Sequence, residues 1–537
     1  MLAKLKLLLK DTTIYGASTI LASGLNYLLV PFYANLLTLE ENGIQSIIYS
    51  SITFASVIYT FGLESAYLKF AADKKVLEKR QLEESTKETT VVTNKVFSPS
   101  LSGSNENHPK WGESIFSTPF IGLFSSSLCF TVFIFIFSSR IAEVLGLSGA
   151  ESGYVQFAAV ILLIDTMSTL PLAWLRSERK AGIFSSIKLV NVLVTIAVSL
   201  WLVVVEDLGV RGVFYGNIAG SIISLGLASS YTIKFSAFVP LRFSKNLFRQ
   251  MMRYGLPLVP NSIAMMLIDF VDRLILIRIP QETIQEIYGQ QISPEALVGI
   301  YGRVYSLAVL AQLLVRMFRF AWQPFYLQQA AEPDAKALFS KVLTIATVFI
   351  TTFTLFASFF VPLVIQIHFF GKFYILPPAF WIGLSVLPIL YLSYVFDVIS
   401  SILFAGLLIE KKTEFLPVIT LIGAAVTAIL CFALIPLPNK WGAMTGAALA
   451  TTAGSLAMAV GAYFFSQKIY PNNFEWGKIL LSLFSALFIF IFSSYLSLLM
   501  NSWIVNSVSF SIYTGLILYF FRVEAKQVFY RVKGKKA

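Results

Sequence analysis

Residues 415–435 read FLPVITLIGAAVTAILCFALI, a stretch without a single charged side chain. Such a stretch can cross a bilayer as a helix, because a hydrocarbon core of ~30 Å needs about 20 apolar residues. Fourteen runs of this kind lie at approximately 12–37, 44–69, 115–138, 154–175, 182–205, 210–234, 254–279, 297–325, 340–367, 376–409, 415–435, 441–466, 477–499 and 502–521. They are continuous rather than alternating, which disfavours an outer-membrane barrel. We therefore predict an all-α polytopic membrane protein with 14 transmembrane helices.

The composition excludes several other classes of protein. Of 537 residues, 56% are hydrophobic and 13% charged, with a mean hydropathy of +0.74, whereas soluble domains carry roughly 25% charged residues. A soluble multidomain enzyme and a disordered chain are both excluded. Cys129 and Cys431 lie in apolar runs, only two histidines occur, and no GxxxxGK motif is present. We expect no disulfide, metal, catalytic residue or bound cofactor, and no ATP hydrolysis by the chain itself.

Two of the apolar runs differ from a simple span. The first follows Lys4, Lys6 and Lys10 and resembles a signal peptide, but its apolar stretch is too long and has no convincing cleavage site. We expect it to remain as the first span. The run 376–409 is too long for one simple span, and we expect a helix with a proline-marked entry (Pro377, Pro378 and Pro388) and an extended inner end.

The distribution of basic residues predicts the topology. Of 41 Lys and Arg residues, 31 lie in the segments on the N-terminal side of the membrane, and the other side has only Arg140, Arg211, Lys372 and Lys440. Cytoplasmic loops are enriched in Lys and Arg. Both termini are therefore expected in the cytoplasm of a bacterial inner-membrane protein, and the net charge of +12 reflects topology rather than nucleic-acid binding. The one long loop, 71–114, is then cytoplasmic, either an inserted linker or a docking site for a cytoplasmic partner.

An internal repeat divides the chain. Tyr15-Gly16 recurs as Tyr254-Gly255, and Gly43 with Tyr49 recurs as Gly299 with Tyr305. At an offset of 232, the residues Asp165, Ser168, Ala173, Glu178, Arg179 and Lys180 correspond to Asp397, Ser400, Ala405, Glu410, Lys411 and Lys412. At an offset of 234, Gly212 and Ala219-Gly220-Ser221 correspond to Gly446 and Ala453-Gly454-Ser455. We expect an N-lobe at 1–235, a C-lobe at 236–470, and two additional helices with a basic tail at 471–537. A parallel repeat of six helices favours a transporter.

Polar stripes on two spans indicate faces turned away from lipid. The second span carries a stripe of Tyr49, Thr53, Ser56, Thr60, Glu64 and Tyr67, and the eighth one of Tyr305, Gln312, Arg316, Arg319 and Gln323. The two stripes nearly superpose at the repeat offset of 256. Asn26 belongs to a weaker stripe on the first span. We expect these faces to line a cavity.

Charged residues within the spans are the candidates for binding and coupling. Arg316 and Arg319 could contact an anionic substrate through bidentate guanidinium groups, or snorkel to headgroups. Glu64 could pair with either arginine, carry a coupling proton, or simply end a helix. Asp269 and Asp272 are further coupling candidates, with Arg273 either salt-bridged to Asp269 or lining the cavity.

The remaining intramembrane charges suggest smaller roles. Lys188 aligns with Asn191 and Thr195 on one face of the fifth span and could also line the cavity. Asp165 and Asp397 are expected to be buried and hydrogen-bonded within their bundles, and Arg278 and Arg303 to be anchors at the outer boundary.

The segments RYGLPLVPNSIAMMLIDFVDRLIL (253–276), VGIYGRVYSLAVL (298–310) and FRFAWQPFYLQ (318–328) resemble bacterial polysaccharide-unit (O-antigen, Wzx-type) flippases. FGLESAYLKF (61–70) and KWGAMTGAALATTAGS (440–455) resemble the same family, within the multidrug/oligosaccharidyl-lipid/polysaccharide exporter superfamily. The resemblance implies two six-helix lobes that move a lipid-diphosphate-linked oligosaccharide to the outer leaflet. It also implies that cationic residues receive the diphosphate, a role that falls on Arg316 and then on Arg319, Arg273 and Lys188.

Three functions compete on this basis. The first is a flippase for an undecaprenyl-diphosphate-linked oligosaccharide, by alternating access coupled to a proton or sodium gradient, with membrane lipids and other polysaccharide-assembly proteins as partners. The second is a cation-coupled multidrug exporter, which would favour an acidic cavity. The third is a membrane polysaccharide polymerase or ligase, although the external loop near 280–296 is short. The sequence favours transport over enzymatic chemistry.

Overall fold

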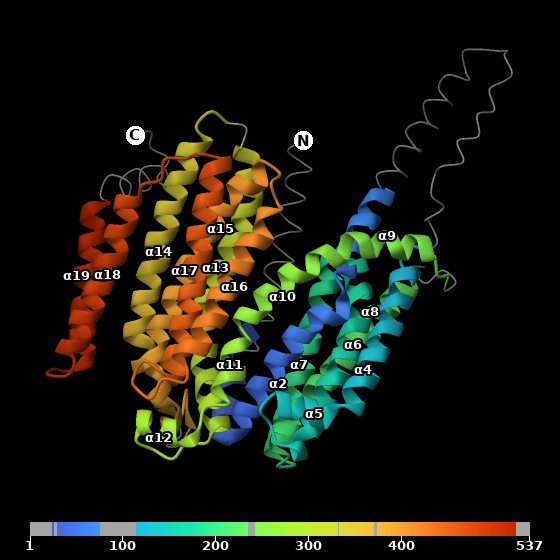
Figure 1. The fold of residues 1–537 in the computed structure, drawn as a ribbon, viewed down its shortest axis with the longest axis horizontal. Helices are drawn as coiled ribbons and strands as arrows, with labels where there is room; N and C mark the ends of the chain where they lie inside the picture. Colours follow the sequence, from blue (N-terminus) through green and yellow to red (C-terminus); the bar gives the residue numbers. More distant parts are fainter. Residues whose placement is uncertain are drawn as a thin grey trace. The chain divides into compact units, whose positions relative to one another are not determined.

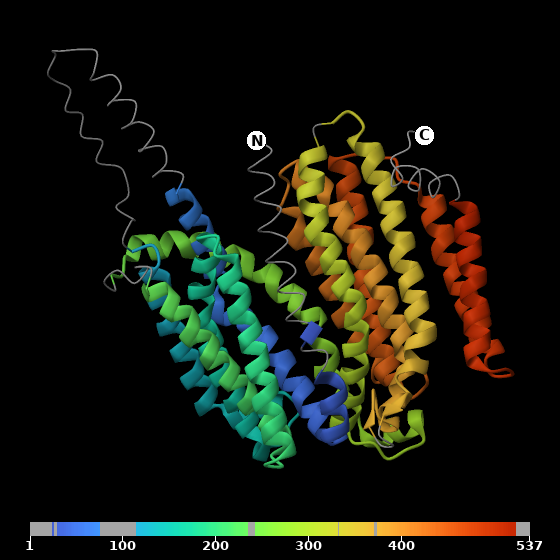
Figure 2. The same cartoon turned by 180° about the vertical axis from the view of Figure 1, so that it is seen from behind.

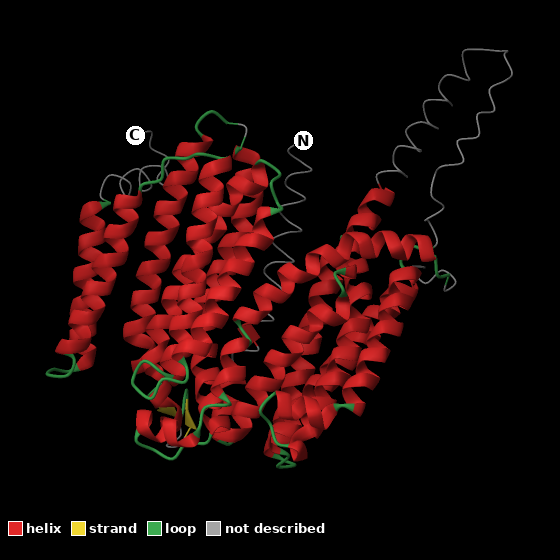
Figure 3. Ribbon diagram, in the orientation of Figure 1, coloured by secondary structure: helices red, strands yellow, loops and turns green. Residues whose placement is uncertain are grey.

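The computed structural model describes residues 24–25, 29–75, 114–234, 242–330, 332–369 and 373–521. These residues form helices almost throughout (Figure 3). The longer helices are α2 (Leu39–Thr60), α4 (Ser117–Ile136), α6 (Ser152–Ser177), α7 (Ala181–Val204), α8 (Gly209–Lys234), α13 (Pro294–Gln329), α14 (Ala335–Val364), α15 (Leu387–Ile409), α16 (Phe415–Leu434), α17 (Ala443–Ile469), α18 (Trp476–Leu496) and α19 (Ser502–Phe520).

Shorter elements connect the long helices. They are α5 (Ser138–Val144), α9 (Lys245–Gly255), α10 (Val259–Ile268), α11 (Val271–Leu276) and α12 (Gln281–Tyr288), with 3-10 turns η1 (Gly149–Glu151), η2 (Leu256–Leu258) and η3 (Pro378–Val386). The strands β1 (His368–Phe369) and β2 (Phe373–Tyr374) pair antiparallel. The turn η3 begins at Pro378 and leads into α15, so the proline-marked entry expected for the run 376–409 is confirmed.

The all-α multi-pass membrane architecture is confirmed. Within the described ranges, ten helices are long and apolar enough to cross a membrane, or twelve if two bent pairs are each one span. The second span bends by 44° between Leu39–Thr60 and Leu63–Lys75, and the eighth bends by 42° within α13. The run 254–279 is divided into η2, α10 and α11. Most of the first run and most of the 71–114 loop lie outside the described residues, so the count of fourteen stays a prediction.

The chain forms two compact units. Unit 1 comprises 1–26 and 48–266, and unit 2 comprises 27–47 and 267–537. In unit 1, α4, α6, α7 and α8 lie side by side, and in unit 2, α13 to α17 do so (Figure 1). This division follows compactness rather than the sequence repeat. The expected lobes at 1–235 and 236–470 and the segment 471–537 stay a prediction.

Residues 29–47 belong to unit 2 because glycines let this segment approach α13 closely. A Cβ atom on Gly43 would lie 1.9 Å from the Glu295 carbonyl oxygen, and one on Gly299 would lie 2.2 Å from the Leu39 carbonyl oxygen. No side chain fits at such distances. The start of the second span is thus packed directly on the start of α13.

Local geometry recurs at the offsets found in the sequence. The turn after α6 has Arg179 at φ 54°, and the turn after α15 has Lys411, 232 residues later, at φ 57°. A Cβ on Gly220 of α8 would lie 2.1 Å from Thr195 Oγ1 of α7. On Gly454 of α17 it would lie 1.9 Å from Thr427 Oγ1 of α16. The α7–α8 and α16–α17 crossings therefore use the same small-residue contact.

The two last helices, α18 and α19, pack on α14 within unit 2 (Figure 2). Leu355 and Phe359 of α14 form a core cluster with Ala486, Ile489 and Tyr513 of α18 and α19. The Tyr513 hydroxyl lies 3.0 Å from Ser482 Oγ, so this buried polar pair is satisfied inside the bundle. The predicted basic tail lies outside the described residues.

Candidate functional site: two polar clusters within the spans

A polar cavity of about 570 Å³ lies inside unit 1. It is enclosed by Leu63–Lys75, α6, α7 and α8. Charged, amide and hydroxyl side chains predominate in its lining, which consists of Glu64, Asp165, Ser168, Thr169, Leu172, Arg176, Phe184, Lys188, Asn191, Val192, Thr195, Asn217, Ser221 and Ser224. Charged groups survive inside a membrane-spanning bundle only when they are paired or hydrated. A cavity of this size and polarity supplies both conditions.

Glu64 pairs with Arg176 of α6 across the cavity. Both side chains retain about a third of their accessible surface, at 38% and 33%, so water reaches the ion pair. Of the alternatives that the sequence left open for Glu64, a pairing with Arg316 or Arg319 is not what the structure shows, because the partner is Arg176. Arg176 follows Asp165 by eleven residues, about three helical turns, and therefore lies on the same face of α6, nearer the carboxylate of Glu64.

Asp165 forms the second charged group of the cavity. Its carboxylate accepts a hydrogen bond of 2.6 Å from Ser221 Oγ, which confirms the expected bonding within the bundle. The expected burial is wrong, because Asp165 is open to the cavity. Lys188 of α7 lies within electrostatic range of Asp165 and Arg176. Lys188 shares the cavity with Asn191 and Thr195, as their spacing predicted.

In unit 2, charged side chains are packed against one another. Asp272 of α11 is fully buried, accepts a hydrogen bond of 2.8 Å from the Tyr301 hydroxyl, and forms a 3.1 Å ion pair with Arg273. Arg273 also donates to Ser46 Oγ at 3.1 Å and to the backbone carbonyl of Asp269. The sequence suggested Asp269 as the ionic partner of Arg273. The structure instead gives that place to the neighbouring Asp272.

Asp269 has a different partner. Its carboxylate accepts a hydrogen bond of 2.7 Å from the Tyr305 hydroxyl, and the Arg273 guanidinium lies 4.6 Å from the centre of the Tyr305 ring. Tyr301 and Tyr305, one turn apart on α13, thus each hold one aspartate of the broken seventh span. Nearby on α13, Arg319 pairs with Asp397 of α15 and donates to Ser401 Oγ at 2.6 Å.

The other predicted residues are placed less centrally. Arg316 is exposed and donates to Gln312 at 3.1 Å, Gln323 is also exposed, and Asn26 lies outside the described residues. Arg278 is exposed. Arg303 is only 8% exposed and donates to the side chains of Asn42 and Gln45. The expected anchoring role of Arg303 is therefore wrong, because its guanidinium ties the start of α2 to α13.

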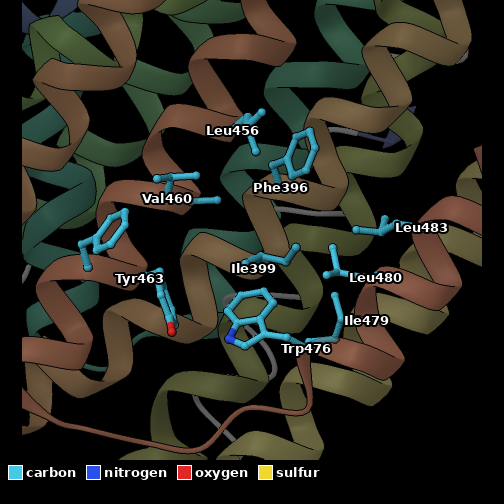
Figure 4. Close-up of a pocket in the computed structure, with 11 residues that line it drawn as sticks. Phe396, Ile399, Leu456, Val460, Tyr463, Trp476, Ile479, Leu480 and Leu483 are labelled. Atoms are coloured by element: carbon cyan, nitrogen blue, oxygen red, sulfur yellow. The ribbon is translucent and has the colours of Figure 1, made fainter.

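An apolar groove of about 380 Å³ lies between α15, α17 and α18 of unit 2 (Figure 4). Phe396, Leu456, Tyr463, Trp476 and Leu480 are among the side chains that line it. The groove presents almost no polar atoms, so its chemistry suits a hydrocarbon chain.

Comparison with known proteins finds one family match and several solved structures with a similar fold. Residues 105–329, less than half of the chain, match the family model described as polysaccharide biosynthesis protein. A structure described as "Lipid II flippase MurJ, inward closed conformation" superposes with a TM-score of 0.66 at 12% identity, covering 95% of this chain and 99% of the other. The chain shares the fold of this structure over nearly its whole length.

Two further MOP-superfamily structures agree. An inward-facing multidrug resistance MATE family transporter has a TM-score of 0.60 at 13% identity, covering 85% of this chain and 94% of the other. A transporter from Pyrococcus furiosus has a TM-score of 0.52 at 12% identity, covering 86% and 95%. No curated protein sequence matches the chain. These likenesses show a shared fold, and the described helices are those of a multi-pass membrane protein.

Sequence reasoning missed Arg176, the basic partner in the cavity. Arg176 lies among the basic residues that mark the cytoplasmic end of α6, and the topology rule alone explained it. The signal that could have found it is the series Asp165, Ser168, Leu172 and Arg176, whose spacing of 3, 4 and 4 keeps all four residues on one helical face.

Proposed function

We propose that this protein translocates a lipid-diphosphate-linked oligosaccharide from the inner to the outer leaflet of the bacterial cytoplasmic membrane by alternating access. The observation that carries the proposal is the polar cavity of unit 1, whose side chains donate and accept hydrogen bonds as a polyhydroxylated sugar requires. The family match over residues 105–329 and the fold shared with a lipid II flippase support this class of substrate. The apolar groove of unit 2 is compatible with the lipid portion.

The charge balance of the cavity disfavours the alternative of a multidrug cation exporter. An exporter of organic cations needs carboxylates that are not neutralised by the protein. Here Glu64 is paired with Arg176, and Asp165 has Lys188 within electrostatic range. Two acids and two bases leave the cavity close to neutral, which favours an uncharged sugar.

The diphosphate would be received by Arg316. Arg319 and Arg273 are already committed to Asp397 and Asp272, and withdrawing either would leave a carboxylate without its partner. Arg316 is exposed on α13, and its guanidinium donates a hydrogen bond to the neutral amide of Gln312. Because the Arg316 guanidinium is exposed and bonded to a neutral amide, it can offer bidentate donors to phosphate oxygens without breaking an ion pair.

The test uses full-length protein in a flippase-deficient bacterial host and in proteoliposomes holding a fluorescent lipid-diphosphate-linked saccharide. The wild type should restore surface polysaccharide and move the labelled lipid, and Arg316→Ala should reduce both at least tenfold. Arg316→Lys should retain part of the activity, and Met317→Ala, at an exposed neighbouring position, should retain all of it. Full activity of Arg316→Ala would remove that residue from the mechanism. Transport of cationic dyes without the lipid-linked saccharide would overturn the function itself.

Coupling to a proton or sodium gradient is proposed to involve Asp269. The unit 2 cluster holds three carboxylates (Asp269, Asp272 and Asp397) against two guanidinium groups, and only Asp269 has neither in an ion pair. The excess negative charge can be balanced by a proton or a cation. Asp269→Asn should therefore permit downhill movement of the lipid but abolish its response to an imposed ion gradient. An unchanged response would exclude Asp269 as the coupling group.

A polysaccharide polymerase or ligase is the third possibility. Such an enzyme needs an accessible external loop with catalytic residues, whereas the 280–296 region contains the folded helix α12. Burial raises the pKa of the Tyr288 hydroxyl at the end of α12 to about 12, and its oxygen accepts a hydrogen bond of 3.3 Å from the Met444 backbone.

External labelling of a cysteine at Gln290 on a Cys129→Ser, Cys431→Ser background should show the proposed topology, and protection from the label would reverse it.

A further inference from the structure

The helix α9 belongs to unit 1 and leads into the seventh span, and hydrogen bonds hold it in a defined position. Ser244 caps its N-terminus by accepting a hydrogen bond from the Leu247 backbone N–H at 3.4 Å. The Ser244 backbone N–H donates to Thr118 Oγ1 at 3.1 Å, and Ser117 Oγ donates to the Arg242 carbonyl at 2.8 Å. The helix is therefore fastened to the start of α4 (Figure 1).

One face of α9 is part of the core of unit 1. Leu247 and Met251 are 1% and 0% exposed, and they join a cluster with Leu123 and Leu175. A Cβ on Gly122 of α4 would lie 2.3 Å from the Phe248 ring, which shows how closely α9 packs. This end of unit 1 also holds Leu175 and its basic neighbours, the side that the sequence assigns to the cytoplasm.

The opposite face of α9 is uniformly basic. Lys245, Arg249 and Arg253 follow one another at intervals of four residues, so they form one row along the helix. All three are exposed, and α9 contains no acidic residue. Within the described part of the chain, none of the three side chains has a hydrogen-bond or ion-pair partner. The row thus presents three positive charges that the fold does not use.

Apolar side chains at both ends place this row at the membrane boundary. Phe243, just before the helix, is 48% exposed, and Tyr254, at its last turn, is 37% exposed. Leu256 is 49% exposed and begins the apolar run of the seventh span. A soluble polyanion would match the charges but would leave these side chains in water. A lipid surface satisfies both, with headgroups at the basic row and hydrocarbon at its ends.

We propose that the basic row of α9, defined as Lys245, Arg249 and Arg253, binds the headgroups of anionic phospholipids in the cytoplasmic leaflet. The charges are complementary, and juxtamembrane Lys and Arg residues attract anionic lipids in this way. Because α9 continues through η2 into α10, bound headgroups would hold the start of the seventh span at a set depth. The lipid is thus a partner of the protein, separate from the molecule that it transports.

The experiment is native mass spectrometry of full-length protein in detergent, with added phosphatidylglycerol or phosphatidylcholine. Each basic residue near an anionic surface contributes about fivefold to binding at low salt. The triple variant K245Q/R249Q/R253Q should therefore bind phosphatidylglycerol on the order of a hundredfold more weakly than the wild type, with no change for phosphatidylcholine. High salt should reduce the difference.

Matched variants separate this effect from misfolding and from net charge. K411Q/K412Q/K468Q removes three exposed basic residues at the ends of α15 and α17 that do not form a row on one helix, and it should weaken phosphatidylglycerol binding much less than the variant of the row. R249K/R253K keeps the charge and should also retain binding. Equal losses in the two triple variants, or equal affinities for the two lipids, would overturn the proposal. Displacement of phosphatidylglycerol by inorganic pyrophosphate at equimolar concentration would instead assign the row to the substrate diphosphate and likewise overturn it.

Discussion

The two units place an ion pair between corresponding spans but orient it oppositely. In unit 1 the acid, Glu64, lies on the second span and the base, Arg176, on the fourth. In unit 2 the base, Arg319, lies on the eighth span and the acid, Asp397, on the tenth. At the repeat offset of 256, Arg319 corresponds to position 63, adjacent to Glu64. The repeat therefore preserves the helices that meet but not the positions of the paired groups, because Asp397 corresponds to Asp165 and position 408, which corresponds to Arg176, is a leucine.

The two units also differ in how they stabilise these charges. Unit 1 keeps them around a cavity of about 570 Å³, where water can solvate whatever the protein leaves unpaired. Unit 2 packs them against tyrosine hydroxyls, and Asp272 has no accessible surface. A hydrated pair can exchange its partner for a ligand at small cost, whereas a desolvated pair cannot. In the proposed function, unit 1 would therefore bind the sugar, and unit 2 would receive the diphosphate at Arg316 and couple transport to the ion gradient.

The largest effect on stability is expected from Arg273→Ala. It would leave the buried Asp272 carboxylate without its ionic partner, at a cost of about 3–5 kcal/mol, measured as a large fall in melting temperature in detergent. Arg319→Ala should cost less, because Asp397 retains 20% of its side-chain surface. The double variant Asp272→Asn, Arg273→Met should recover much of the loss. If Arg273→Ala and Arg319→Ala cost the same, burial does not distinguish these pairs.

An intermediate loss of stability is expected at the α7–α8 and α16–α17 crossings, where the two units are alike. Gly220→Ala and Gly454→Ala each force a Cβ against a threonine hydroxyl, at 2.1 and 1.9 Å, and overpacking of this kind costs about 1–3 kcal/mol. Gly226→Ala on the same helix as Gly220 meets no atom within 4 Å and should be neutral or slightly stabilising. Melting temperatures of the three variants give the comparison. A harmless Gly454→Ala beside a damaging Gly220→Ala would show that the two crossings are not equivalent.

The smallest effect on stability is expected for the ion pair between Glu64 and Arg176 in the cavity of unit 1. Its effect on transport is not expected to be small. Glu64→Gln and Arg176→Gln should each change stability by less than about 1 kcal/mol, because water reaches both groups. Both should lower flipping of the labelled lipid in proteoliposomes, and the exchange Glu64→Arg, Arg176→Glu should restore part of it. Thr169→Val, which changes another cavity residue, serves as the control for altered lining. Single variants that melt far below the wild type would show that the pair is structural.

Much of the architecture could be predicted from patterns within single segments. The apolar runs, the proline-marked start of α15 and the offsets of 232 and 234 all reappear in the described helices. They could be read because span length and helix period depend on neighbouring residues alone. The shared face of Lys188, Asn191 and Thr195 was predictable for the same reason.

The ionic partners were decided by tertiary structure. Glu64 and Arg176 are 112 residues apart, and Arg303 and Asn42 are 261 apart. Which of them meet depends on the rotation and depth of each helix against its neighbour, and no periodicity within one helix contains that information. Even the choice between Asp269 and Asp272 for Arg273 was made by the break before α11 and by two tyrosines on α13. The sequence alone determined a membrane-spanning helical architecture with its repeat, and packing determined which charges are buried, which are hydrated and which stay outside an ion pair.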